Sequence, residues 1–160
     1  MIFNNSVKKR IFDITFSFIG LVLVIPLIIP FIFLIWLQDF DNPLYIADRV
    51  GLNFKKFKII KLRSMISKAD KSKVDSTSAN DPRITKVGAI IRKLKLDELT
   101  QLFNVFKGEM SFVGPRPNVE RETNLYSIKE KELLKVKPGI TDFASIVFSD
   151  ESEILKDYQN

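Results

Sequence analysis

The feature that most constrains this chain is a run of uncharged, mostly apolar residues from Ile14 to Gln38. The run is long enough to enter a lipid bilayer. It is longer than the apolar core of a signal peptide, and no small-residue cleavage site comes before the next charges. Pro26 and Pro30 lie near its middle, where each removes a backbone donor and favours a kink. We therefore predict a membrane-inserted helix that bends at Pro26.

Basic residues flank this run on both sides. Lys9 and Arg10 precede it, and a lysine cluster from Lys55 to Lys61 follows it at some distance. Positive charge favours the cytoplasmic face, so both flanks are expected there. A re-entrant helix satisfies both flanks, with residues 1–40 as the anchor and residues 41–160 as a cytosolic catalytic domain. A kinked helix that spans the bilayer stays open as the alternative, because prolines also occur in spanning helices.

Two missing residue types narrow the chemistry. The 160 residues include no cysteine and no histidine, which excludes a disulfide framework, a thiol nucleophile and a histidine base. The formal net charge of +6 suits an anionic partner such as a nucleotide diphosphate or an acidic lipid. Nucleic acid is disfavoured as the partner, because the basic residues follow no recognised nucleic-acid-binding motif and the apolar run would have no role. Any acid, base, nucleophile or metal ligand is then expected mostly among Asp, Glu, Lys, Tyr, Ser and Thr, which favours the Asp97-Glu98 pair as a candidate.

Adjacent carboxylates stand at the start of a predicted helix. Leu99, Leu102, Phe103 and Phe106 form an apolar stripe at helical spacing, which we expect to pack against a core, and a glycine follows at 108. Asp97 and Glu98 then occupy the first turn, where the helix dipole favours ionised carboxylates and attracts anions. Asp97 could equally be a simple N-cap, since aspartate is a preferred capping residue.

A stiff basic loop follows this helix. Arg116 lies between Pro115 and Pro117, and the two rings restrict the backbone that carries the guanidinium. A planar guanidinium binds phosphate in a bidentate manner. Taken alone, the Pro-Arg-Pro sequence is also compatible with a rigid exposed turn.

Several short motifs occur along the chain in a characteristic order. They are KRIFD at 9–13, RVG at 49–51, KLRSM at 61–65, DPRIT at 81–85, IRKLKLDEL at 91–99, SFVGPRP at 111–117 and KPGIT at 137–141. Together they closely resemble the small bacterial phosphoglycosyl transferases, the monotopic enzymes of the bacterial sugar transferase family. The resemblance covers nearly the whole chain. Ile25, Ala47, Asp142 and Ser145 depart from the family's usual residues.

The resemblance implies a reaction and a place for it. A phosphosugar would pass from a UDP-sugar to polyprenyl (undecaprenyl) phosphate with release of UMP, as the first membrane step of surface glycan assembly. Asp97 would form a covalent aspartyl intermediate, and Glu98 would hold Mg²⁺. The expected phosphate- or nucleotide-binding residues are Arg116, Arg92, Lys61, Arg63, Pro115 and Pro117. The domain would face the cytoplasm at the bacterial inner membrane, and a homo-oligomer stays open.

The remaining pattern predicts a mixed, helix-rich α/β domain. Residues 54–65 read as a strand, 67–80 as a surface loop, 81–83 as a turn, 119–136 as mixed helix and 137–139 as a turn. Family domains normally continue past the position of Asn160, so we expect a C-terminally truncated domain. A catalytically inactive, membrane-attached anion-binding or scaffold protein is therefore the alternative function.

Overall fold

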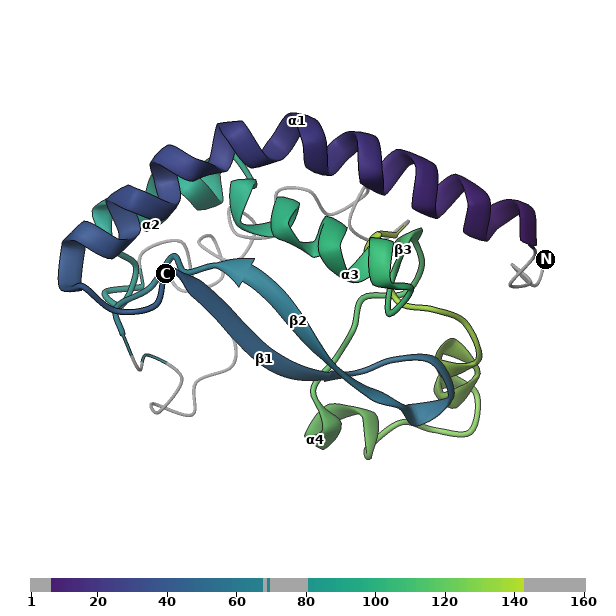
Figure 1. The fold of residues 1–160 in the computed structure, drawn as a ribbon. Coiled ribbons are helices and arrows are strands. Elements are labelled where there is room, and N and C mark those ends of the chain that lie inside the picture. Colours follow the sequence, from purple (N-terminus) through teal and green to yellow (C-terminus); the bar gives the residue numbers. More distant parts are fainter. Residues whose placement is uncertain (1–6, 68, 70–80, 143–160) are drawn as a thin grey trace.

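The computed structural model describes residues 7–67, 69 and 81–142 (Figure 1). Within these residues the chain is helix-rich and of mixed α/β type, as predicted. The elements are α1 (Val7–Asp39), β1 (Leu44–Val50), η1 (Leu52–Phe54), β2 (Lys56–Leu62), α2 (Lys86–Lys93), η3 (Leu96–Gln101), α3 (Leu102–Lys107), β3 (Ser111–Val113), α4 (Glu120–Thr123), η4 (Glu130–Lys135) and β4 (Gly139–Thr141), where η denotes a short 3-10 helix.

The long helix α1 contains the whole apolar run. It continues through Pro26 and Pro30, and it is bowed, with α2 and α3 beneath its concave side (Figure 1). One stripe of α1 is buried, and its apolar members Leu21, Ile28 and Ile35 fall at a spacing of seven residues. Many large apolar side chains on its other faces are exposed, and α1 is long and apolar enough to cross a membrane. The re-entrant path through a bilayer stays a prediction.

Both ends of α1 are tied to the rest of the chain. Near its start, Lys9 donates a hydrogen bond to a backbone carbonyl in β3, and Arg10 donates to two carbonyls at the end of α3. Asp13, which is buried, accepts from the Ser111 hydroxyl. At the other end, Arg63 pairs with Asp39 at 2.5 Å. Both ends of α1 therefore contact the same folded unit.

This arrangement leads to a topology prediction. The chain has no cysteine, so single cysteines can be introduced by Val7→Cys and Asn53→Cys, both at exposed positions. In oriented membrane vesicles, a membrane-impermeant maleimide should label both from the cytoplasmic face alone. Leu23→Cys, on the exposed apolar surface of α1, is the control and should resist labelling until detergent is added. Labelling of Val7→Cys and Asn53→Cys from opposite faces would establish a spanning helix.

Beneath α2 and α3 lies a twisted hairpin (Figure 1). β1 and β2 pair antiparallel, with Tyr45 opposite Lys61 and Arg49 opposite Phe57. The strand predicted at 54–65 is confirmed as the shorter β2, because the chain turns through η1 at its start, where Asn53 has φ 53°. Phe57 and Ile59 on β2 bury against α3 and the segment after it, through Val105 and Met110. A second cluster joins β2, α2 and η3 to Ile28 and Ile35 of α1.

The segment predicted as a turn at 137–139 is instead extended chain. Gly139 opens β4, which pairs in parallel with β3. The Ser111 amide donates to the Pro138 carbonyl at 2.8 Å, and the Gly139 amide donates to the Pro115 carbonyl at 3.0 Å. A Cβ atom at Gly139 would lie 2.1 Å from the Gly114 nitrogen, so glycine is needed for close approach of two backbones rather than for a turn. The turn prediction was therefore wrong.

The other local predictions fared unevenly. The turn at 81–83 is confirmed, and residues 119–136 contain two short helices, α4 and η4. The surface loop predicted at 67–80 falls almost entirely outside the described residues.

Candidate active site

The carboxylate pair lies in the first turn of η3. Lys95, with φ 53°, occupies the N-cap position, and no side chain caps the helix. The simple N-cap reading of Asp97 is therefore wrong. The helix continues as α3 and ends at Gly108 with φ 91°, as predicted. A left-handed residue there is best supplied by glycine.

The predicted apolar stripe is only partly buried. Leu102 is buried and Leu99 half-buried, but Phe103 and Phe106 are exposed. The Phe106 ring lies 6.3 Å from the ring of Phe18, itself an exposed residue of α1. Phe106 thus extends the apolar surface of α1 instead of packing into the core, and Phe103 is exposed beside it in the sequence of α3.

A cavity of about 440 Å³ opens beside the carboxylates. It is lined by predicted site residues from four parts of the chain, namely Asp97, Glu98, Lys61, Arg63, Arg92, Arg116 and Pro117. The structure thus brings both carboxylates and all four predicted cations to one site. Pro115 does not line this cavity, and its carbonyl accepts a hydrogen bond from the Gly139 amide. The predicted anchor residues Lys9, Arg10 and Pro26 lie elsewhere, on α1.

Glu98 is held by cations. Its Oε1 atom lies 2.9 Å from the Lys61 ammonium and 3.5 Å from the Arg116 guanidinium. Burial favours the neutral form of this carboxyl, but the charge and hydrogen bond of Lys61, with the charges of Arg116 and Lys95, outweigh it and lower the pKa of Glu98. Glu98 is therefore ionised at neutral pH. Arg116 keeps 61% of its side chain exposed, so it remains accessible to a ligand.

Asp97 has a different environment from its neighbour. Burial raises its pKa, and the charge of Glu98 acts in the same direction, while the charges of Lys61 and Arg92 lower it. The sequence pointed to the helix dipole as the reason for an ionised Asp97. In the structure the charge of Lys61 favours the ionised form of Asp97 most, followed by a hydrogen bond from the backbone amide of Asp97 itself and by the charge of Arg92. A half-buried carboxylate with a raised pKa is a better nucleophile than a fully solvated one.

Arg63 lines the cavity and also makes a structural contact with α1. Its side chain is only 10% exposed, and it bonds Asp39 and the Ile35 carbonyl at the end of α1. Its Nε atom is buried and has no hydrogen-bond partner among the described residues. Arg63 therefore links the cavity to α1, a role that the sequence did not indicate.

Sequence reasoning missed several residues of the cavity wall. They include Tyr45, Arg49, Arg83, Gln101, Asn118 and Glu122. Tyr45 and Arg49 share one face of β1, since alternate residues of a strand point the same way, so a strand prediction for 44–50 would have found them. For Asn118 the sequence carries no signal.

The cavity offers oxygen ligands suited to Mg²⁺. Among the described residues, no group of three His, Cys, Asp or Glu side chains lies close enough to hold a metal together. Mg²⁺ needs fewer protein ligands, because one or two carboxylates with phosphate oxygens and water complete its shell. Glu98, which is ionised and lines the cavity, fits such a site.

Comparison with known proteins places the chain in a family. The sequence model of the bacterial sugar transferases matches residues 4–159. A Bacillus subtilis protein, provisionally named an undecaprenyl-phosphate N-acetylgalactosaminyl 1-phosphate transferase, is 49% identical over 109 residues, which cover 68% of this chain and 61% of that protein. Exopolysaccharide production protein ExoY of Rhizobium meliloti is 38% identical over 152 residues, covering 86% of this chain and 67% of that protein.

A third relative is much longer. The undecaprenyl-phosphate glucose phosphotransferase of Komagataeibacter xylinus is 38% identical over 162 aligned residues, which cover 96% of this chain but 30% of that protein. The chain thus spans between 30% and 67% of the length of these three relatives. The family match, in contrast, extends over almost all of the chain. The protein therefore belongs to the bacterial sugar transferase family.

Proposed function

We propose that this chain is a phosphoglycosyl transferase that moves a phosphosugar from a UDP-sugar to polyprenyl phosphate and releases UMP. Relatives are named for transfers to undecaprenyl phosphate, which supports this acceptor. The observation that carries the proposal is the cavity itself, whose wall combines two adjacent carboxylates with six cationic side chains. A diphosphate brings negative charge, and the cations of this cavity complement it.

In the first step, a carboxylate oxygen of Asp97 attacks the sugar-bearing phosphorus of the UDP-sugar. The phosphorus–oxygen bond to the UMP phosphate breaks, and UMP leaves with the bridging oxygen. An acyl phosphate then links Asp97 to the sugar. In the second step, a phosphate oxygen of the polyprenyl phosphate attacks the same phosphorus, and Asp97 leaves as a carboxylate. The product is a polyprenyl diphosphate sugar.

The surrounding residues bind and orient the substrate in both steps. Arg116, whose side chain is more exposed than that of Lys61, would hold phosphate oxygens as charge redistributes. Arg92 of α2, a half-buried residue whose charge acts on Asp97, would do the same. Lys61 keeps Glu98 in place and offsets the charge of Asp97. When bound at Glu98, Mg²⁺ would neutralise charge on the transferring phosphoryl group.

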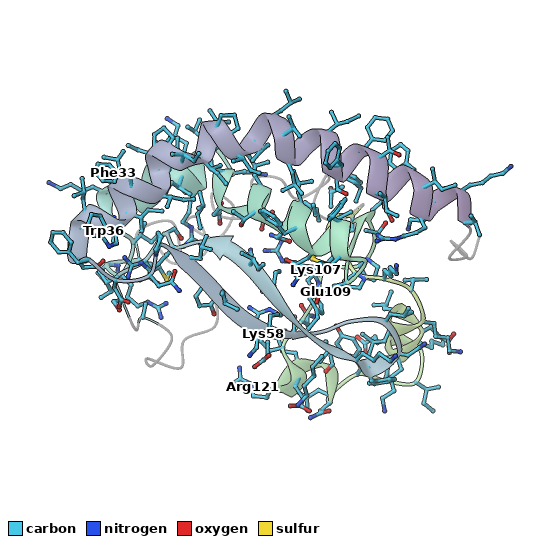
Figure 2. All side chains as sticks on the ribbon, viewed as in Figure 1. Phe33, Trp36, Lys58, Lys107, Glu109 and Arg121 are labelled. Atoms are coloured by element: carbon cyan, nitrogen blue, oxygen red, sulfur yellow. The ribbon has the colours of Figure 1, made fainter. Side chains whose placement is uncertain are left out.

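The apolar surface of α1 gives the reaction its place. A polyprenyl phosphate is dissolved in a membrane, so the enzyme has to reach the lipid–water boundary. Figure 2 shows Phe33 and Trp36 on the C-terminal part of α1, where their rings lie 6.0 Å apart and both residues are exposed. Aromatic residues are typical of the membrane interface. We place α1 in the bacterial inner membrane and the cavity on its cytoplasmic side.

The function is tested by UMP release. The protein, in detergent or nanodiscs, is incubated with Mg²⁺, undecaprenyl phosphate and one of three donors, UDP-N-acetylgalactosamine, UDP-galactose or UDP-glucose. These are the sugars in the names of its relatives. We expect UMP and a lipid-linked phosphosugar in equal amounts from one donor. Specific donor binding without UMP release from any of them would favour the inactive anion-binding protein.

Arg116 yields a second prediction. Arg116→Lys keeps the charge and should keep the fold, since the side chain is 61% exposed. It should nevertheless lower turnover at least tenfold, because an ammonium cannot reproduce bidentate contact with a phosphate. Turnover is measured by UMP release and the fold by thermal unfolding. Arg121→Lys, outside the cavity wall, is the matched control. Unchanged turnover in Arg116→Lys would show that Arg116 belongs to an exposed turn and does not bind phosphate.

A further inference from the structure

The outer edge of β2 is completed by side chains instead of by a strand. In the part of the chain that the structure describes, β2 pairs with β1 on one edge and with no strand on the other. The backbone groups of Lys58 and Ile60 on that second edge face η3 and α3. Asn104 donates to the Lys58 carbonyl at 2.7 Å and accepts from the Ile60 amide at 3.2 Å, while the Thr100 hydroxyl donates to the Ile60 carbonyl at 2.9 Å. Polar side chains thus satisfy three backbone groups that would otherwise lack partners.

The Thr100 and Asn104 side chains are buried, and each also contacts a residue of its own segment. Asn104 is fully buried, and Thr100 is 2% exposed. The Asn104 amide also donates to Glu109 at 2.7 Å, and Figure 2 shows Glu109 below α3, on the side of the hairpin. The Thr100 hydroxyl lies 3.2 Å from the carbonyl of Asp97. One hydroxyl therefore touches both β2 and the residue proposed as the nucleophile.

The position of these contacts along β2 matters for the cavity. Ile60 directly precedes Lys61, whose ammonium lies 2.9 Å from Glu98. The ion pair joins residues on two different elements, so its geometry depends on how β2 is placed against η3. An ångström of displacement is enough to lose such a contact and to change a rate about a hundredfold.

We propose that Thr100 and Asn104 are positioning residues, which bond the outer edge of β2 and so hold the Lys61 ammonium against Glu98 beside Asp97. The effect on turnover rests on the proposed function, but the position of Lys61 does not. A purely structural role would lower stability without singling out Lys61. If Thr100 and Asn104 position Lys61, their loss should change the reactivity of Lys61 specifically. A variant that retains the Thr100 hydroxyl should keep the reactivity of the unaltered chain.

The test compares the chemical reactivity of two lysines on the same strand. Acetic anhydride labels free amines, and peptide mass spectrometry gives the rate at each site. Lys61 is half-buried in its ion pair, whereas Lys56, paired with Glu120 at the exposed end of β2, serves as the internal reference. Thr100→Val keeps the shape and removes the hydroxyl. We expect it to raise the acetylation rate of Lys61 relative to that of Lys56 about fivefold. UMP release should fall about tenfold, which corresponds to the free energy of one hydrogen bond.

Two further threonine variants make the test specific. Thr100→Ser keeps the hydroxyl and should restore both the labelling ratio and most of the turnover. Thr123→Val is the matched control, because Thr123 is also 2% exposed. Among the described residues, its hydroxyl donates a hydrogen bond to the Glu120 carbonyl within α4. This control variant should leave the labelling ratio unchanged.

Asn104→Leu should release the same edge more strongly and raise the ratio further. If that variant does not fold, the comparison of Thr100→Val with Thr100→Ser still tests the proposal. An unchanged labelling ratio in Thr100→Val, or an equal rise in Thr123→Val, would overturn the proposal. If the unaltered chain releases no UMP, the proposed function fails, but the labelling ratio still tests the positioning of Lys61.

Discussion

Asp97→Asn should abolish the covalent intermediate. Incubated with a UDP-sugar and Mg²⁺ but no lipid acceptor, the unaltered chain should gain the mass of one phosphosugar, mapped to the peptide that contains Asp97. The variant should gain none, because a neutral carboxamide lacks the anionic oxygen that attacks phosphorus. Intact-protein mass spectrometry measures the adduct, and UMP release in the same sample should fall to background.

The structure supplies a matched control for this change. Asp48→Asn removes a carboxylate from the exposed Lys58 pair on the hairpin, outside the cavity wall, so adduct formation should persist. A phosphosugar found on another residue would overturn the assignment of the nucleophile. Full turnover by Asp97→Asn would overturn the two-step mechanism itself.

Glu98→Gln should slow both half-reactions about a thousandfold, equivalent to roughly 4 kcal/mol of lost barrier stabilisation. Two effects contribute. Glutamine is a weaker ligand for Mg²⁺, since it carries no charge. It also removes the anion that Lys61 pairs with at 2.9 Å, which leaves a half-buried ammonium without its partner. Adduct formation and lipid transfer are measured separately, across a range of Mg²⁺ concentrations.

The Mg²⁺ series distinguishes the two effects. If Glu98 holds the metal, the variant should need a higher Mg²⁺ concentration for half-maximal rate. Glu120→Gln, which breaks the exposed pair with Lys56, should behave as the unaltered chain. A Glu98→Gln variant with normal rates and normal Mg²⁺ dependence would exclude Glu98 from the metal site.

The parts of the site that the sequence predicted are those that lie close together in it. Asp97 and Glu98 are neighbours, and Arg116 stands in a compact motif between prolines, so short-range pattern and family resemblance found them. The contact of Lys61 with Glu98 joins residues 37 positions apart. The sequence named both residues but could not show that they bind each other, because that depends on the packing of β2 against η3.

The wrong predictions have related causes. Lys137 to Gly139 has turn-forming residues, yet a parallel partner strand at β3 gives their backbone a better set of hydrogen bonds. Phe103 and Phe106 have the spacing of core residues, but spacing alone does not distinguish a protein core from an apolar exterior. In both cases a distant segment contacts the residues in question: β3 pairs with the strand that begins at Gly139, and Phe18 of α1 contacts the Phe106 ring.

The way α1 packs has a consequence for attempts to isolate the catalytic region as a fragment. Ile28 and Ile35 are almost completely buried, and they share one cluster with Leu62, Ile91 and Leu96. Replacing one such side chain by alanine typically costs about 2–5 kcal/mol, against a total stability of about 5–15 kcal/mol for a whole domain. A fragment that begins at Asp41 would lose both isoleucines at once. The anchor is therefore part of the folding unit, and a water-soluble version has to be sought by redesign of the outer face of α1 rather than by its deletion.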